Sequence, residues 1–380
     1  MTTDRENKRP PGQGRRKGRS DGRGARGRGE GPIAALDLGT NNCRLLVARP
    51  DGAGFSVMDA FSRAVRLGEG VEASNTLSEA AQDRAIKALR ICAGKIRHHR
   101  VRDQRIVATE ACRRAINGRD FVRRVNRETG LTMDIISPEE EARLAVAGCA
   151  PLIDPTAEQL LVFDIGSGST ELIWIDMSGT PQARRENLIR ALAPLGRGRN
   201  ETATARAAAA HIADWISIPM GVSTLHDRFA HLDDTASRFA AMSLHFEERL
   251  APFAPYDSAD PEGLTQNLQI VGVSGTATTF GALHLGLRTY DRSKVDGLWL
   301  PADSAGEVAD QLLAMDPTDR AQHPGIGRGR SELVISGSAI LMTILRIWPV
   351  DRLRIADRGL REGILYGLIQ ARRDRRERSK

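Results

Sequence analysis

Two stretches of the chain carry the same pattern of residues that could hold a phosphate. The first, IAALDLGTNNCRLLVA, starts at Ile33, and the second, LLVFDIGSGSTELIWI, starts at Leu160, so that Asp37 aligns with Asp164. Each copy leads from an apolar strand through an Asp into a turn of Gly and small polar residues, and then into a second apolar strand. Glycines bring successive backbone N–H groups to one side of such a turn, and hydroxyl or amide side chains add donors. The candidate phosphate ligands are Gly39, Thr40, Asn41, Asn42, Gly166, Ser167, Gly168, Ser169 and Thr170.

A single glycine-rich turn would be weak evidence, because hairpin turns use the same residues for shape alone. The second copy of the pattern favours function, since two such loops facing each other would bind a phosphate from both sides.

Two carboxylates, Asp164 and Glu171, flank the second loop. Two like charges beside a phosphate are costly without a cation, and Mg²⁺ takes one or two carboxylates together with phosphate and water oxygens. We therefore expect Asp164 and Glu171 to hold Mg²⁺. The alternative is that Glu171, on a strand, faces solvent. The chain has no C-x-x-C, H-x-x-x-H or H-E-x-x-H motif, so a zinc site is not expected.

A third glycine turn, residues 272–278, follows an apolar strand and opens a helix. Backbone N–H groups at a helix N-terminus and the helix dipole favour an anion there. An ordinary strand-to-helix turn with an N-cap Thr is the alternative. Its position after a buried strand leads us to expect phosphate contacts from Ser274, Gly275 and Thr276.

The elements that must position these loops alternate between strands and helices in both halves of the chain, which indicates an α/β fold. Ser137 and Pro138 mark a helix start, as an N-cap and a first helical residue. The alternating and helical spacing of apolar residues predicts strands at 33–37, 43–49, 55–60, 105–109 and 135–136, and helices over 78–98, 110–128, 137–149, 332–347 and 360–373, with a long helical span near 200–252.

Length and composition fit a two-domain protein of 380 residues without a membrane segment. The strongly apolar uncharged run 333–345 has 13 residues, whereas a membrane-spanning helix needs about 20. The four cysteines show no disulfide pattern, so we expect the protein to lie in a reducing cytoplasm.

Residues 1–30 hold ten Lys and Arg against four acids and almost nothing apolar, which predicts a disordered basic tail. This tail resembles RNA-binding arms, or it only aids solubility. A second basic tail covers 374–380.

Seven motifs together resemble the exopolyphosphatase / guanosine pentaphosphate phosphatase family. They follow the family's order over roughly residues 32–370: DLGTNNCRLLV, VATEACRRAING, IISPEEEARLAVAG, FDIGSGSTEL, SIPMGVSTL, VGVSGTATTFGAL and IADRGLREGILYGL. The resemblance implies the fold of the actin, sugar-kinase and heat-shock-ATPase superfamily. In that fold, two ribonuclease-H-like lobes of mixed sheets flanked by helices enclose an active cleft. Lobe I would comprise 31–138 and about 358–373, and lobe II 139–357. We also expect a homodimer.

The resemblance further implies Mg²⁺-dependent hydrolysis of a terminal phosphoanhydride. Glu141 would be the base that activates water, although spacing alone does not distinguish it from its neighbouring glutamates. Asp164 and Glu171 would hold metal or water, Arg113 would bind phosphate, and Asp37 belongs to the first phosphate loop. One departure is that Ser167 stands where the family usually has glycine in the second loop.

The substrate suggested by the resemblance is inorganic polyphosphate or guanosine pentaphosphate (pppGpp), which would give ppGpp. We favour polyphosphate, because basic tails help to hold a polyanion by releasing counterions. A small-molecule kinase on the same scaffold and a non-enzymatic RNA-associated protein are the more remote alternatives.

Overall fold

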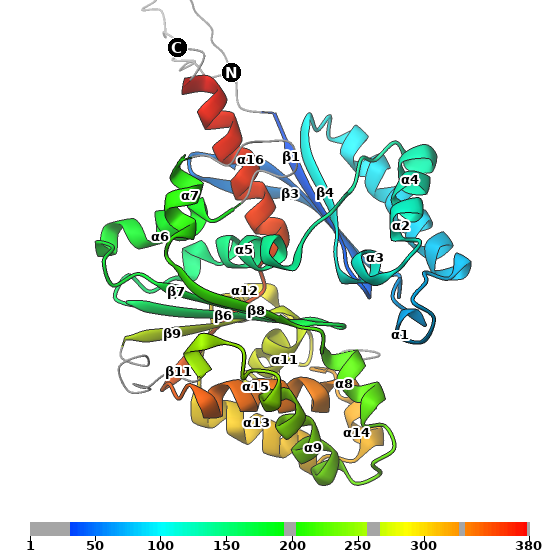
Figure 1. The fold of residues 1–380 in the computed structure, drawn as a ribbon, viewed down its shortest axis with the longest axis vertical. Coiled ribbons are helices and arrows are strands. Elements are labelled where there is room, and N and C mark those ends of the chain that lie inside the picture. The colour runs from blue at the N-terminus through cyan, green and yellow to red at the C-terminus, as the bar shows by residue number, and fades with distance from the viewer. Residues whose placement is uncertain (1–30, 194–202, 257–266, 327–330, 378–380) are drawn as a thin grey trace, which may run out of the picture. The chain divides into compact units, whose positions relative to one another are not determined.

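The computed structural model describes residues 31–193, 203–256, 267–326 and 331–377, and these residues form two sheets with helices on both faces of each (Figure 1). The basic tail predicted over 1–30 lies outside the described residues, as do 378–380.

The first sheet has the strand order β3-β2-β1-β4-β5. Its first three strands, at the places predicted from the sequence, form an antiparallel meander, and β4 and β5 lie parallel to β1. The strands are β1 (Ile33–Leu38), β2 (Asn42–Asp51), β3 (Gly54–Ala64), β4 (Asp103–Ala108) and β5 (Asp134–Ile135).

Strand β1 is apolar at successive positions because helices cover both faces of its sheet. Ala34 and Leu36 lie in the core under α2 and α4, whereas Ile33 and Ala35 lie in the core under α5 and α16. The helices of this half are α1 (Val71–Ser74), α2 (Glu79–His98), α3 (Glu110–Arg114), α4 (Gly118–Thr129), α5 (Pro138–Gly148) and α16 (Leu360–Glu377).

The second sheet repeats this plan with the order β10-β11-β9-β6-β7-β8. Strands β6, β7 and β8 form an antiparallel meander, and β9 and β11 continue in parallel from β6. The duplication seen in the sequence therefore extends to sheet topology. The strands are β6 (Gln159–Ile165), β7 (Thr170–Asp176), β8 (Ile212–Ile218), β9 (Leu268–Val273), β10 (Trp299–Pro301) and β11 (Arg352–Ala356).

Helices also cover both faces of the second sheet. Phe163 packs in the core with α11, α13 and α15, whereas Val162 faces the core that α5 and α6 share. The elements of this half are η1 (Ala150–Leu152), α6 (Gln182–Ala191), α7 (Ala203–Ala209), α8 (Val222–Arg228), α9 (Thr235–Glu248), η2 (Ala254–Tyr256), α11 (Ser274–His284), α12 (Arg292–Val295), α13 (Ala302–Ala314), α14 (Pro317–Gln322) and α15 (Leu333–Ile347).

The predicted helical span near 200–252 is wrong, because β8 lies inside it. This strand is only half buried at the edge of the sheet, and its antiparallel pairing with β7 defines it. Helix α16 also runs further than predicted, to Glu377, so the first residues of the predicted C-terminal tail are helical. Arg372 in its last turns donates to Asp103 at 2.6 Å.

The chain passes between the two sheets twice, through α5 and through the segment that joins β11 to α16. The lobe boundaries expected near 138 and 358 stay predictions. At the crossings the backbones of α5 and α16 are in direct contact, which only glycine allows. A Cβ at Gly148 would overlap Gly359 O, and a Cβ at Gly363 would overlap Leu144 O. The predicted fold class, two lobes of mixed sheets flanked by helices, is confirmed. Among the residues that the structure describes, no helix has the length and apolar character needed to span a membrane.

Candidate active site

The two loops predicted from the repeat are turns of the same construction. In the first, the Gly39 N–H donates to Asn42 O at 2.9 Å, and in the second the Gly166 N–H donates to Ser169 O, also at 2.9 Å. Each turn joins two antiparallel strands of its own sheet. The repeat in the sequence is therefore a repeat in backbone structure.

The strand register gives each loop aspartate a charged neighbour. Asp37 pairs with Arg44 across β1 and β2, and Asp164 pairs with Glu171 across β6 and β7. Directly opposed residues of antiparallel strands share a face of the sheet. The alternation of side chains places Asp37 on the face that α5 and α16 cover, and Asp164 on the face toward α5. The two aspartates therefore point toward the helices that cross between the sheets.

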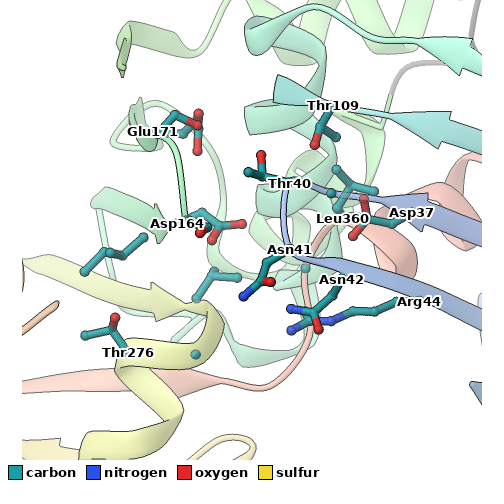
Figure 2. Close-up of a pocket in the computed structure, with 18 of the residues that line it drawn as sticks. Asp37, Thr40, Asn41, Asn42, Arg44, Thr109, Asp164, Glu171, Thr276 and Leu360 are labelled. Carbon is teal, nitrogen blue, oxygen red and sulfur yellow. The ribbon is translucent and has the colours of Figure 1, made fainter. Parts of the chain in front are cut away.

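A cavity of about 230 Å³ lies between the loops (Figure 2). Asp164 and Glu171 lie on one side of it, and Thr40 and Asn41 on the other. The loops approach closely, since a Cβ at Gly168 would lie 3.6 Å from Thr40 Oγ1. The predicted site residues that line this cavity are Asp37, Gly39, Thr40, Asn41, Asn42, Glu141, Asp164, Gly166, Ser167, Gly168, Ser169, Glu171, Gly275 and Thr276.

Two predicted site residues do not line the cavity, and one cannot be placed. Thr170 is fully buried, and its hydroxyl donates to Met220 O at 2.8 Å. Arg113 lies behind the cavity wall, where it contacts other site residues. The side chain of Ser274 lies outside what the structure describes.

Arg113 holds Glu141 in place. Its Nη1 donates to Glu141 Oε2 and to Ile136 O, both at 2.9 Å, and its Nη2 donates to Glu110 Oε2 at 2.8 Å. Burial raises the pKa of Glu141 well above its usual range, and the charge of Glu171 adds to this, whereas Arg113 lowers the pKa. The Glu141 carboxyl therefore keeps its proton to a higher pH than an exposed glutamate does.

The start of α5 places Glu141 in the lining of the cavity. Ser137 caps the helix by accepting a hydrogen bond from the Glu140 N–H at 3.1 Å, and Pro138 occupies the first turn, as predicted. Glu141 consequently lies at the end of that turn, at the point where the chain enters the crossing between the sheets.

Two further carboxyls in the cavity have raised pKa values. Burial raises the pKa of Glu171 to about 7, the Asp164 charge adds to this, and hydrogen bonds from Ser169 and Ser217 oppose it. Ser217 Oγ donates to Glu171 Oε1 at 3.0 Å. Burial also raises the pKa of Asp37, although Arg44 and Arg361 lower it. Several carboxyls with perturbed pKa values in one cavity are typical of a functional site.

The donor set on the second loop fits Mg²⁺. In the part of the chain that the structure describes, no group of three or more His, Cys, Asp or Glu side chains could hold a metal ion on its own. Asp164, which is half-buried, and Glu171, which is buried, instead offer two opposed carboxylates whose repulsion a cation would relieve. Mg²⁺ binds in this way, with one or two carboxylates while water and phosphate oxygens complete its shell.

Two arginines near the first loop were not predicted from the sequence. Arg44 and Arg361 line the cavity, and both act electrostatically on Asp37. Alignment of the two copies could have identified Arg44, because it takes the position of Glu171. Arg361 could not be identified in this way, because it lies outside both copies of the repeat. It lines the cavity because the first turn of α16 lies there.

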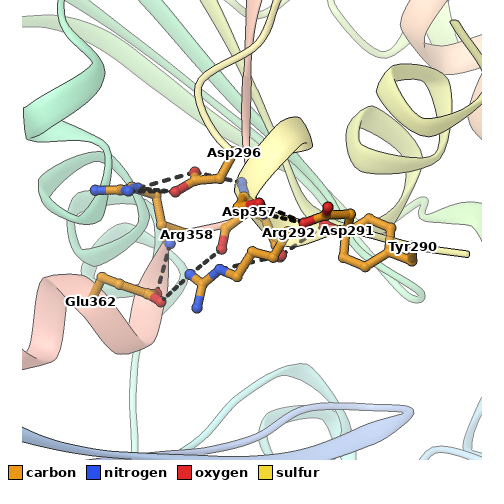
Figure 3. Close-up of polar contacts among 9 residues, drawn as sticks. Tyr290, Asp291, Arg292, Asp296, Asp357, Arg358 and Glu362 are labelled. Carbon is orange, nitrogen blue, oxygen red and sulfur yellow. Dashed lines mark hydrogen bonds and ion pairs between the residues drawn. The ribbon is translucent and has the colours of Figure 1, made fainter. Parts of the chain in front are cut away.

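The segment that joins β11 to α16 forms part of the cavity lining and is held by α12 and the residue after it (Figure 3). Arg358 Nε donates to both oxygens of Asp296, at 3.0 and 3.1 Å. Arg292 Nη2 donates to Glu362 Oε1 at 3.0 Å, and Glu362 Oε2 accepts from the Gly359 N–H at 3.0 Å. These contacts tie the beginning of α16 to the second lobe and so fix one wall of the cavity.

Known proteins resemble this chain in sequence and in fold. The model of the Ppx/GppA phosphatase family matches residues 46–372. The crystal structure of the Aquifex aeolicus member of that family is 27% identical with a TM-score of 0.70, covering 90% of this chain and 98% of that one. An exopolyphosphatase-like protein is 28% identical with a TM-score of 0.73, covering 90% and 99%. An exopolyphosphatase from Cytophaga hutchinsonii, at 22% identity and a TM-score of 0.72, covers 90% and 98% and shows the same fold.

Proposed function

The chain belongs to the Ppx/GppA phosphatase family, and we propose that it is a Mg²⁺-dependent exopolyphosphatase that releases terminal phosphate from inorganic polyphosphate. As a member of this family it is a phosphoanhydride hydrolase. The observation that carries the proposal is that two loops of the same construction, one from each sheet, line a single cavity together with Glu141. Two of the similar structures are named exopolyphosphatase or exopolyphosphatase-like.

We assign Glu141 as the general base. Hydrolysis of a phosphoanhydride needs a water placed in line with the bond that breaks, and a group that takes its proton. Arg113 engages Oε2 of Glu141, so we assign Oε1 as the oxygen that accepts the proton. The raised pKa of Glu141 means that it binds a proton more strongly than an exposed glutamate does, which suits a general base.

The two loops would bind the terminal phosphate through backbone N–H groups and the side chains of Thr40 and Asn41. Arg44 and Arg361 add positive charge on the side of the first loop, where the next phosphates of a polyanion would lie. Asp164 and Glu171 would hold Mg²⁺, which when bound would neutralise charge on the phosphate oxygens.

The test is phosphate release by the purified protein from polyphosphate, pppGpp and ATP, each with and without Mg²⁺. We expect release from polyphosphate that needs Mg²⁺. Glu141→Gln should lower kcat by about 100-fold or more, as expected for loss of a general base. Glu139→Gln is the matched control, because Glu139 lies in the same helical turn with its side chain 51% exposed. Absence of phosphate release from polyphosphate would refute the proposal.

A second candidate substrate is pppGpp. Val222, Leu333 and Val334 form an apolar part of the same cavity, and apolar side chains beside phosphate ligands suit a nucleobase. A higher kcat/KM for pppGpp than for polyphosphate in the assay above would favour this candidate.

The proposal also covers the location and the partners of the protein. The four cysteines are free and buried, which fits the proposed reducing cytoplasm. The homodimer and the RNA contact through residues 1–30 stay predictions, and the latter residues lie outside the described part of the chain.

A further inference from the structure

Ser167, the residue that departs from the family's usual glycine, has a hydroxyl partner from another element. Its Oγ lies 2.7 Å from Oγ of Ser223, at the start of α8. Ser167 is not among the residues with positive φ, so a side chain fits there without backbone strain. Ser167 is among the residues that line the cavity, and Ser223 is not.

The backbone fixes the two serines relative to each other. The Ser223 N–H donates to Ser167 O at 2.9 Å, and the Val222 N–H donates to Gly166 O at 3.0 Å. Gly221 makes this approach possible, because a Cβ there would overlap Gly166 O. The hydroxyl pair therefore belongs to a rigid junction between the second phosphate loop and α8.

The chemistry of two paired hydroxyls allows two arrangements. Each hydroxyl has one hydrogen to donate and lone pairs that accept. If Ser167 donates to Ser223, the lone pairs of Ser167 remain toward the cavity and repel an anion. If Ser223 donates to Ser167, the Ser167 hydrogen is available to the cavity. A phosphate oxygen accepts hydrogen bonds and carries negative charge, so its presence selects the second arrangement.

We propose that Ser167 Oγ donates a hydrogen bond to a non-bridging phosphate oxygen of the substrate. Ser223 is the positioning residue, because its hydroxyl donates to Ser167 Oγ and so orients the Ser167 hydroxyl. The inference rests on the proposed function and adds a side-chain donor to a loop whose other donors include backbone N–H groups. Hydrogen bonds in such a chain polarise one another, so the charged acceptor strengthens both.

The experiment compares Ser167→Ala, Ser223→Ala and the double variant in steady-state hydrolysis of polyphosphate. Removal of the Ser167 hydroxyl should raise KM about tenfold, because it removes a hydrogen bond to a charged group, and kcat should change little. Ser223→Ala should raise KM less, and the double variant should match Ser167→Ala, since Ser223 acts only through Ser167. Ser223→Thr, which keeps a hydroxyl, should restore KM to nearly the wild-type value.

Thr76→Val is the matched control, because it removes a hydroxyl pair with Ser74 at 3.1 Å that lies outside the cavity. Melting temperatures of all variants show whether a change in KM reflects loss of fold. A purely structural role for Ser223 would lower the melting temperature without a change in KM.

Calorimetric binding of inorganic phosphate gives a readout that does not depend on turnover. Weaker phosphate binding by Ser223→Ala and Ser167→Ala supports the inference even if wild-type protein hydrolyses nothing, an outcome that would defeat only the proposed function. KM and phosphate affinity both within twofold of wild type in Ser167→Ala would overturn the inference. So would a further loss when Ser223→Ala is added to Ser167→Ala, because Ser223 would then act by another route.

Discussion

Replacing Arg113 with Met should lower hydrolysis on the acid side of the pH profile, and activity should recover as the pH rises. Burial and the nearby Glu171 raise the pKa of Glu141, and Arg113 opposes them through its charge and its 2.9 Å hydrogen bond. Without the guanidinium the pKa of Glu141 rises further, so the carboxyl stays protonated over a wider range. A protonated carboxyl cannot accept a proton from water, and activity on the acid side of the pH profile is lost.

The expected size of the effect follows from the contact that is removed. A hydrogen bond to a charged group contributes about 1.5–3 kcal/mol, which corresponds to roughly a 10- to 100-fold change in kcat/KM at pH values where the base is protonated. Above the new pKa the loss should be small, because a deprotonated Glu141 no longer needs Arg113 to hold its charge. Arg113 also contacts Glu110 and Ile136 O, so the variant requires a measurement of stability.

The assay is kcat/KM for phosphate release from about pH 6 to pH 9, since this profile reports the essential groups of the free enzyme. The acid limb should move to higher pH in Arg113→Met and move less in Arg113→Lys. Arg124→Met is the control, because it removes a guanidinium that pairs with Glu128 at 2.7 Å on the outer helix α4. A loss of equal size at every pH, or an unchanged acid limb, would refute the assignment of Glu141 as a base tuned by Arg113.

Three further predictions concern stability. The pKa of Glu171 is near 4.5 when the chain is unfolded and about 7 when it is folded, so the folded state loses on the order of 3 kcal/mol of stability as the pH rises between these values. Without divalent cations, Glu171→Gln should therefore make the melting temperature depend less on pH over this range. An unchanged dependence would contradict the raised pKa. Gly363→Ala should lower the free energy of unfolding by about 3 kcal/mol or prevent folding, because the new Cβ would overlap a carbonyl. Gly94→Ala in α2 has open space around it and should raise the free energy of unfolding by roughly 0.5–1 kcal/mol. Urea denaturation measures both changes. Asp296→Asn removes the charge that faces Arg358 and should lower the free energy of unfolding by about 2 kcal/mol in the same assay, and a variant as stable as wild type would show that this pair contributes nothing.

The fold class and the two loops could be predicted because their signals are local. Apolar strands, the glycine turns and the cap at Ser137 each depend on a few neighbouring residues, and the structure confirms those elements. Strand β8 depends instead on pairing with β7, so apolar spacing alone misassigned it as helix.

The errors in the candidate site have two different origins, one local and one tertiary. Thr170 was expected to bind phosphate beside Glu171, yet adjacent residues of a strand face opposite sides of the sheet, so the two side chains cannot share the cavity. The strand period was available in the sequence and could have excluded Thr170. The contact of Arg113 with Glu141 joins α3 to α5 and depends on tertiary packing that no local pattern encodes.

The matched hairpins differ in charge at one corresponding position, Arg44 in the first and Glu171 in the second. An unbranched phosphate polymer has two equivalent ends, and its internal units are chemically alike, so the polymer itself does not determine which bond is cleaved. If the proposed function holds, the enzyme itself would supply a direction. The terminal phosphate would bind beside Glu171, and the rest of the polymer would leave the cavity past Arg44. Shortening would then proceed one unit at a time from whichever tip enters, without any recognition of the polymer's middle.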